Sequence, residues 1–130
     1  MKTNKVKITE RGWPAHYILG HRCVFHRNTL LECGDVKIVV SSVGQLMLKR
    51  HNGLEDELVE VGSGRFYETM VFYAKEDKWH DADSTKEVAT YVPDVKDPYD
   101  EIPANSFHDA IVAKYVEKLK KGAKIPILKF

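Results

Sequence analysis

The chain has almost no net charge, no long apolar run and no apolar leader, and each of these shortages excludes a class of protein. Its 20 Lys and Arg residues against 19 Asp and Glu give a net charge of +1, so no general field attracts nucleic acid or anionic lipid. No window approaches the roughly 18 apolar residues of a membrane helix. The basic start, MKTNKVKITERGW, is followed by no apolar core, so it is neither a secretory nor a transit signal. We expect a cytoplasmic protein that binds neither a membrane nor duplex nucleic acid, with any anion site being local.

Common enzyme motifs are also lacking. The sequence has no Gly-x-x-x-x-Gly-Lys loop, no Gly-x-Ser-x-Gly elbow and no Gly-x-Gly-x-x-Gly, and Gly62-Ser63-Gly64 is typical of a turn. The pairs His108-Asp109 and His80-Asp81 have the groups of a general acid or base, but adjacency in sequence does not establish geometry. We therefore predict a non-enzymatic protein without a cofactor, with a nucleotide hydrolase as the enzymatic alternative.

The spacing of the candidate metal ligands does not favour a metal site. His16, His21, Cys23 and His26 fit no compact zinc pattern, and alternate strand residues point to opposite faces. We predict no metal site. In the cytoplasm thiols stay reduced, so Cys23 and Cys33 are expected to be small core residues.

The apolar pattern predicts an α+β fold in one domain, residues 1–130, with an antiparallel sheet followed by one amphipathic helix. Residues 3–92 are rich in strands: 3–10 as an edge strand, short strands at 16–19 and 22–26, a hairpin turning at Gly34-Asp35, a strand at 57–61, the longest strand at 66–74 and a short one at 87–92. An acidic, Pro-containing connection follows at 93–105.

The only convincing helix spans residues 106–121. Asn105 or Ser106 would cap it, Asp109 would complete a capping box, and Gly122 would end it. Its apolar face should lie on the sheet. The tail at 122–130 is too apolar to be solvated, so it either docks on its own domain or crosses to a partner.

One carboxylate interrupts the predicted core face of the strand at 66–74. Phe66, Met70, Phe72 and Ala74 share that face with Glu68. Glu68 either lies near the start of the strand and reaches solvent, or it bonds a ligand or an arginine.

Arginines, aromatic side chains and short polar side chains gather in the strand-forming region, which predicts a site for a planar anion such as a nucleotide. Guanidinium groups pair with phosphate oxygens, and aromatic rings stack on bases. Arg27 is the first choice for phosphate. The candidate ligand-binding residues are Arg11, Trp13, Arg22, Arg27, Asn28, Tyr67, Thr69, Trp79 and Asp109.

Several segments resemble a family of small phage and prophage proteins, the anti-Thoeris "sponge" family, over residues 8 to 120. The segments are Glu10-Arg11-Gly12-Trp13, His16, Cys23, Phe25, Arg27-Asn28-Thr29-Leu30, Val39-Val40-Ser41, Val43-Gly44, Tyr67-Glu68-Thr69-Met70 and Asp81-Ala82-Asp83. The resemblance implies a non-enzymatic protein that sequesters cyclised ADP-ribose signals or cyclic oligonucleotides of bacterial immunity. It also implies an antiparallel sheet with C-terminal helices and a homo-oligomer, either a dimer or a larger ring.

The alternative is a phage protein that binds a host macromolecule through its edge strand and apolar C-terminus. In that case the arginines are ordinary surface charges. Substitution of Arg27 separates the two hypotheses, since only a nucleotide sponge should lose nucleotide binding.

Overall fold

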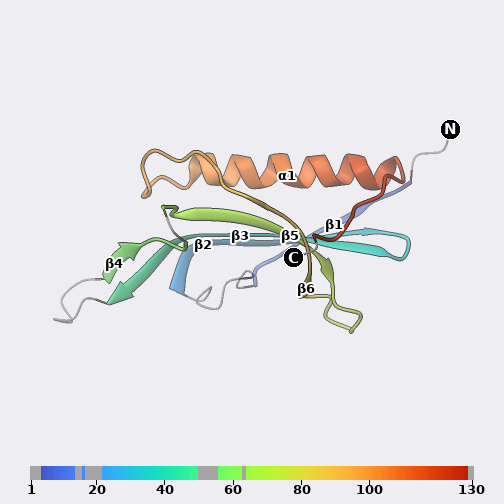
Figure 1. The fold of residues 1–130 in the computed structure, drawn as a ribbon, viewed down its shortest axis with the longest axis horizontal. Helices are drawn as coiled ribbons and strands as arrows, with labels where there is room; N and C mark the ends of the chain where they lie inside the picture. The colour runs from blue at the N-terminus through green and yellow to red at the C-terminus, as the bar shows by residue number, and fades with distance from the viewer. Residues whose placement is uncertain (1–3, 14–15, 17–21, 50–55, 63, 129–130) are drawn as a thin grey trace.

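The computed structural model describes the chain except residues 1–3, 14–15, 17–21, 50–55, 63 and 129–130. Its described part is an antiparallel sheet with helix α1 lying along one face (Figure 1), which confirms the predicted α+β class. The elements are β1 (Lys7–Arg11), β2 (Cys23–Cys33), β3 (Val36–Lys49), β4 (Asp56–Val59), β5 (Tyr67–Ala74), β6 (Ala82–Tyr91) and α1 (Ile102–Lys120).

The strands lie in the order β1-β2-β3-β5-β6, and β4 pairs with the far end of β3. Strand β1 is therefore an edge strand, as predicted for residues 3–10. The β2–β3 hairpin turns at Gly34-Asp35, where Gly34 has a φ of 58°. The predicted hairpin and its glycine are confirmed. The strand predicted at 16–19 lies largely outside the described residues.

Strand β3, and not the segment at 66–74, is the longest strand, so that prediction was wrong. Strand β3 has 14 residues against eight in β5. Its centre, Ser41-Ser42 and Gly44-Gln45, has the composition of a strand end. The strand nevertheless continues because all four residues are buried and because Ser41, Ser42 and Gly44 are paired with neighbours on both sides. Gln45 has no cross-strand partner in these pairings and has a φ of 52°.

The sheet has two faces, and both are covered. Cross-strand partners share a face, so Arg27, Ser42 and Thr69 form one row beneath α1, which we call the helix-covered face. Asn28 and Ser41 form a row on the other side, which we call the opposite face. Strand β5 is buried on both faces, so predicting a single core face for residues 66–74 was incomplete.

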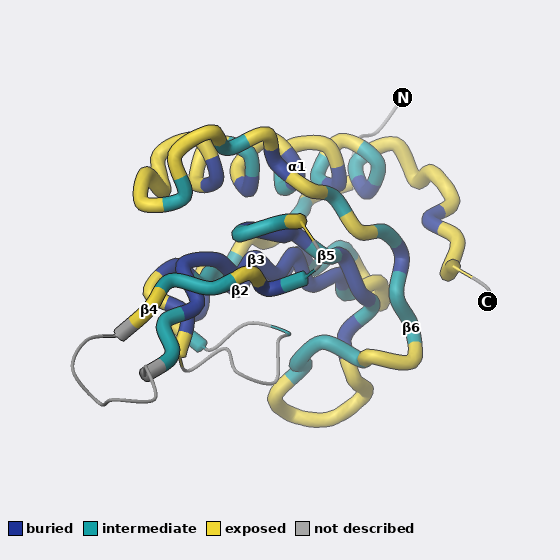
Figure 2. Tube along the Cα trace, turned by 60° about the vertical axis from the view of Figure 1, so that its left-hand side comes forward, coloured by how far each residue is buried: buried dark blue, intermediate teal, exposed yellow. Residues whose placement is uncertain are grey.

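The main core lies between α1 and the sheet. In Figure 2 the side of α1 that faces the sheet is buried and its outer side is exposed, as the amphipathic pattern predicts. The buried members of this core are Leu31, Ile38, Val40, Val71, Val88, Ile111, Tyr115, Leu119 and Ile125.

Helix α1 begins at Ile102, one turn before the predicted start. Pro103 lies in its first turn, where the fixed φ of proline suits a helix and its missing N–H is no loss. The Ncap residue is Glu101, without a side-chain cap, and Asp100 Oδ1 accepts from the Ile102 N–H at 3.0 Å. The predicted cap at Asn105 or Ser106 was therefore wrong. The predicted end at Gly122 is confirmed by its φ of 65°.

The described part of the tail docks on its own domain. Ile125 is buried, the Tyr73 hydroxyl donates to the Ile125 carbonyl at 2.5 Å, and the Leu128 N–H donates to the Glu87 carbonyl at 2.7 Å. Of the two alternatives for the tail, these contacts show the first.

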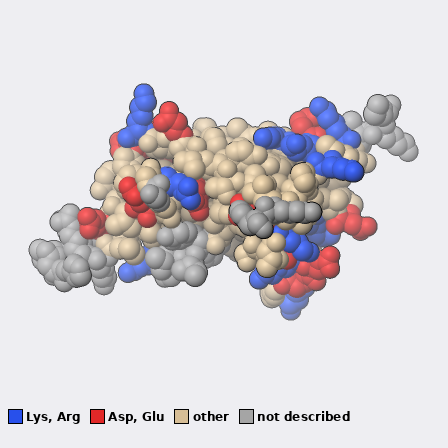
Figure 3. Space-filling view, viewed as in Figure 1, with Lys and Arg blue, Asp and Glu red and all other residues tan. Residues whose placement is uncertain are grey.

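Charged side chains of both signs lie mainly toward the two ends of the face drawn in Figure 3, and its middle is largely uncharged. Among the described residues, no helix is long and apolar enough to cross a membrane.

Candidate binding site on the face opposite the helix

The structure divides the nine predicted binding residues between the two faces of the sheet. Arg11 and Asn28 lie together on the opposite face, with Trp13 against Arg11. The helix-covered side holds Arg27, Tyr67, Thr69 and Asp109. Arg22 is exposed just before β2, and Trp79 is exposed in the turn between β5 and β6.

Arg11 fastens the β5–β6 turn to the edge of the sheet. It ends β1 directly across from Asn28 in β2, and its Nε donates to Asn28 Oδ1 at 2.8 Å. Its Nη1 donates to the carbonyls of Trp79 at 2.8 Å and His80 at 3.0 Å. Three acceptors thus fix the plane of one guanidinium group.

Two donors at this point have no partner among the described residues. They are Arg11 Nη2 and Asn28 Nδ2, both buried. Arg11 is 9% exposed and Asn28 is 1% exposed. Burial lowers the pKa of Arg11, and this effect outweighs the negative charges of Asp81 and Glu32, which act to raise it. An unpaired buried donor costs about 1–3 kcal/mol of folding free energy. A ligand atom that accepts from one of these two donors would recover part of that cost.

An aromatic ring adjoins these donors. The Arg11 Cζ lies 3.9 Å from the ring centre of Trp13, and Trp13 is half-buried. The corner therefore combines two donors with a π face, the pair of features that a nucleotide site requires. Trp79 contributes its carbonyl to Arg11, and its own ring lies beside Lys78, with the Nζ 4.8 Å from the ring centre. We call Arg11, Trp13 and Asn28 the Arg11 cluster.

Farther along the opposite face, Glu68 is buried and paired. Its Oε1 lies 2.7 Å from His16 Nε2, and its Oε2 lies 3.0 Å from Arg65 Nη2. Burial would raise the pKa of Glu68, but the hydrogen bonds and charges of His16 and Arg65 outweigh burial and lower it. Of the two explanations for Glu68, pairing with an arginine is the one observed.

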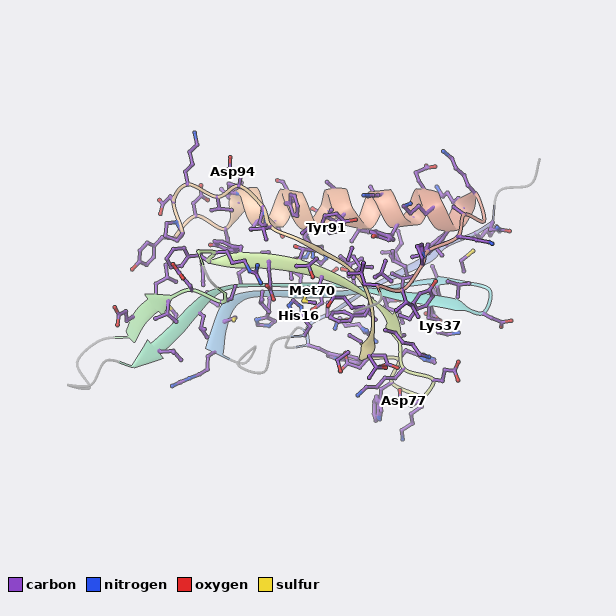
Figure 4. All side chains as sticks on the ribbon, in the orientation of Figure 1. His16, Lys37, Met70, Asp77, Tyr91 and Asp94 are labelled. Atoms are coloured by element: carbon purple, nitrogen blue, oxygen red, sulfur yellow. The ribbon has the colours of Figure 1, made fainter. Side chains whose placement is uncertain are left out.

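His16 also bonds Ser41, so serine, histidine and glutamate lie in the order of a hydrolase triad. The distance from His16 Nδ1 to Ser41 Oγ is 2.8 Å, and the His16 backbone N–H donates to the same oxygen at 2.8 Å. Figure 4 labels His16, which lies on the side of the sheet away from α1. Ser41 is fully buried in the middle of β3. These contacts anchor His16 to the sheet.

On the helix-covered side, Arg27 is already occupied by protein groups. Its Nε and Nη2 donate to the two carboxylate oxygens of Glu10 at 3.0 and 3.2 Å. Its Nη1 donates to Asp109 Oδ1 at 2.7 Å and Asn105 Oδ1 at 3.0 Å. Burial alone would lower the pKa of Arg27, but the two carboxylates raise it. A phosphate at Arg27 would have to displace a carboxylate.

A fully paired polar chain continues from Glu10 into the core. Thr29 Oγ1 donates to Glu10 Oε2 at 2.5 Å, so it accepts from the Nε2–H of His108 at 2.8 Å. The unprotonated Nδ1 of His108 then accepts from the Ser42 hydroxyl at 2.6 Å, and Thr69 donates to Ser42 at 2.6 Å. Burial, aided by the charge of Arg27, lowers the pKa of His108 to about 4, so the ring is neutral at pH 7. We call this the His108 network.

Sequence reasoning missed the role of His108, although a signal was present. His108 falls at helical spacing with the buried residues Ala104, Ile111, Tyr115 and Leu119. A histidine in such an apolar stripe requires partners from the sheet beneath it.

The described residues contain no group of three or more side chains suited to a metal. The candidate His21 lies outside the described residues, and His26 Nδ1 lies 3.1 Å from the Cys23 carbonyl. Both cysteines are free; Cys23 is buried, and Cys33 is half-buried.

Comparisons of the chain with models of protein families, with curated proteins and with solved structures found no match.

Proposed function

We propose that this chain is a non-enzymatic binding protein that sequesters a small nucleotide signal of bacterial anti-phage immunity, either a cyclised ADP-ribose or a cyclic oligonucleotide. The unpaired donors of the Arg11 cluster carry the proposal. An acceptor-rich ligand recovers the free energy that these donors lose by burial. The Trp13 ring, one face of which stacks on the Arg11 guanidinium, is the candidate to stack on a base with its other face. The resemblance of residues 8 to 120 to phage sponge proteins supplies the class of signal and the expectation of a homo-oligomer.

The state of His16 and His108 supports binding without turnover. His108 is completely buried, and both ring nitrogens are engaged. His16 bonds Ser41, whose side chain is fully buried. A sponge needs preorganised donors and no activated nucleophile, which agrees with this arrangement.

The proposal moves the phosphate contact from Arg27 to Arg11. Arg27 is held by two carboxylates, so an approaching phosphate would meet negative charge. Arg11 has no carboxylate partner among the described residues, and its three acceptors are neutral amide oxygens. Arg11 therefore keeps its charge available for an anion.

The sharpest test is Asn28→Asp. In arginine, Nε and Nη2 point the same way, so the new carboxylate accepts from both in a bidentate pair. The substitution thus gives Arg11 Nη2 a partner and removes Asn28 Nδ2. The size of the side chain at position 28 stays the same. We expect the variant to stay folded and to lose at least about tenfold in nucleotide affinity.

The measurement is native mass spectrometry with cyclised ADP-ribose isomers and cyclic di- and trinucleotides, followed by heat release and chromatography of the ligand. The matched control is Arg22→Ala, which removes an exposed arginine outside the cluster. Trp13→Leu should weaken capture, since stacking on a ring is worth about 1–3 kcal/mol per base. Undiminished capture by Asn28→Asp would remove the Arg11 cluster as the site, and release of a cleaved nucleotide would favour a hydrolase.

A further inference from the structure

A large hollow lies where α1 ends and the tail turns back. Its volume is about 670 Å³, within the range of small-molecule sites. Segments from five parts of the chain line it: the start of the described chain, the β2–β3 hairpin, β5, the end of α1 and the tail. We call it the tail hollow.

The walls of the tail hollow are mainly apolar, and among the described residues that line it the charged ones are basic. Leu119, Ile125, Val36 and the Tyr73 ring are among the lining residues. The charged lining residues in the described part of the chain are Lys5 and Lys124, and none of the described lining residues is Asp or Glu. Figure 3 shows Lys and Arg side chains, with Asp and Glu side chains among them, at the end of the molecule where α1 finishes.

Free carbonyl oxygens at the C-terminus of α1 would repel an anion, but the last carbonyls of this helix already accept hydrogen bonds. The Lys120 carbonyl accepts from the Asn4 N–H, and the Leu119 carbonyl accepts from Gly122 and from the Asn4 side chain. The carbonyls of Glu117 and Lys118 accept from Lys121 and Ala123. Few free acceptors remain to offset the two lysines.

From this combination we infer that the tail hollow binds a small amphipathic anion with a hydrocarbon chain, in the manner of a medium-chain fatty acid. The chain lies against the apolar walls, and the carboxylate takes up Lys5 and Lys124 at the rim. The inference is independent of nucleotide capture, because the tail hollow shares no residue with the Arg11 cluster.

The thiol of Cys33 can report whether the tail hollow is occupied. Cys33 lines the tail hollow and is half-buried. The other thiol, Cys23, is buried, and burial raises its pKa to about 11, so it reacts slowly near neutral pH. Modification by iodoacetamide, which is uncharged, therefore reads out occupancy at Cys33.

The experiment follows protection of Cys33 by decanoate in the full chain. Protection should saturate, and the double variant Lys5→Gln/Lys124→Gln should need about tenfold more decanoate. Lys118→Gln/Lys121→Gln, a pair at the end of α1 that does not line the hollow, is the matched control and should behave like the parent. Across octanoate, decanoate and laurate, affinity should rise roughly twofold to fourfold for each added methylene.

A second variant keeps the test independent of charge. Val36→Trp places a large ring in the hollow from a half-exposed position at the hairpin, and it should abolish protection while the protein stays folded. The inference is overturned if decyltrimethylammonium protects Cys33 as well as decanoate does, or if the lysine pair can be replaced without effect. Stronger protection by adenosine monophosphate than by decanoate, or none by any of these compounds, would overturn it as well.

Discussion

Two groups of buried polar side chains, the His108 network beneath α1 and the Arg11 cluster on the opposite face, differ in how far they are paired. Beneath α1, His108 is completely buried and both of its ring nitrogens have partners. On the opposite face, Arg11 and Asn28 each keep a buried donor without a partner among the described residues. A satisfied network rigidifies a core, whereas an unpaired donor lowers stability and raises the affinity for an acceptor. The comparison favours a stabilising role for the His108 network, and it is consistent with the binding role proposed for the Arg11 cluster.

The largest expected effect comes from breaking the satisfied face. His108→Ala leaves the hydroxyls of Thr29 and Ser42 without their partner and opens a cavity beneath α1. We expect the free energy of unfolding to fall by about 3–5 kcal/mol in urea denaturation. His26→Ala is the control, since that half-buried ring bonds one backbone carbonyl. Equal losses in the two variants would show that the network does not stabilise the fold.

Gly44→Ala tests how tightly the same face is packed. A Cβ at position 44 would overlap the ring of Tyr67, its cross-strand partner. We expect a loss of about 1–3 kcal/mol, measured by thermal denaturation. In a double-mutant cycle with Tyr67→Leu, the two losses should not add, because the smaller side chain removes the clash. Gly12→Ala is the control, since a Cβ there meets nothing within 4 Å.

The buried His108 ring beneath α1 should make the free energy of unfolding depend on pH. Burial lowers the pKa of His108 from 6.5 to about 4, so only the unfolded chain takes up a proton between these values. The free energy of unfolding should therefore fall as the pH falls below 6.5, by about 2 kcal/mol at pH 5. The measurement is urea denaturation between pH 7 and pH 5. His108→Gln should flatten this slope, and an unchanged slope would assign it to other groups.

The opposite face should respond to Asn28→Asp with a gain in stability. The new carboxylate pairs with Nε and Nη2 of Arg11, which replaces an unpaired donor by a bidentate ion pair. We expect the free energy of unfolding of the unliganded protein to rise by about 1 kcal/mol. Urea denaturation checks this, and Asn28→Leu, which leaves Arg11 Nε unpaired, should lower the same quantity. A loss with Asn28→Asp would mean that desolvation of the carboxylate outweighs the pair.

Local chemistry was readable from the sequence. Gly34-Asp35 predicted the hairpin because glycine accepts a positive φ, and Gly122 predicted the end of the helix for the same reason. Alternation at 3–10 predicted the edge strand, although Ile8, on the apolar side of the pattern, is exposed in β1. The α+β class followed from the sum of such signals.

Contacts between distant segments were not readable. Arg11 bonds carbonyls 68 and 69 residues away, and no local sequence pattern in either segment predicts that the two lie together. Arg27 was the first choice for phosphate because an arginine in a strand looks free until its partners from β1 and α1 are known. The start of α1 was misplaced because a proline reads as a break, although it fits a first turn.

The smallest expected effect tests the rim of the helix-covered face. Asp109→Asn removes one carboxylate from Arg27, which keeps its two bonds to Glu10 and its bond to Asn105. The Asp109 side chain is 61% exposed, so water screens the pair and the loss should stay within about 0.2–1 kcal/mol in urea denaturation. Since the change also removes negative charge beside Arg27, it should expose any latent affinity of that arginine for phosphate. Nucleotide capture unchanged by Asp109→Asn keeps recognition on the opposite face, whereas stronger capture would return the phosphate contact to Arg27.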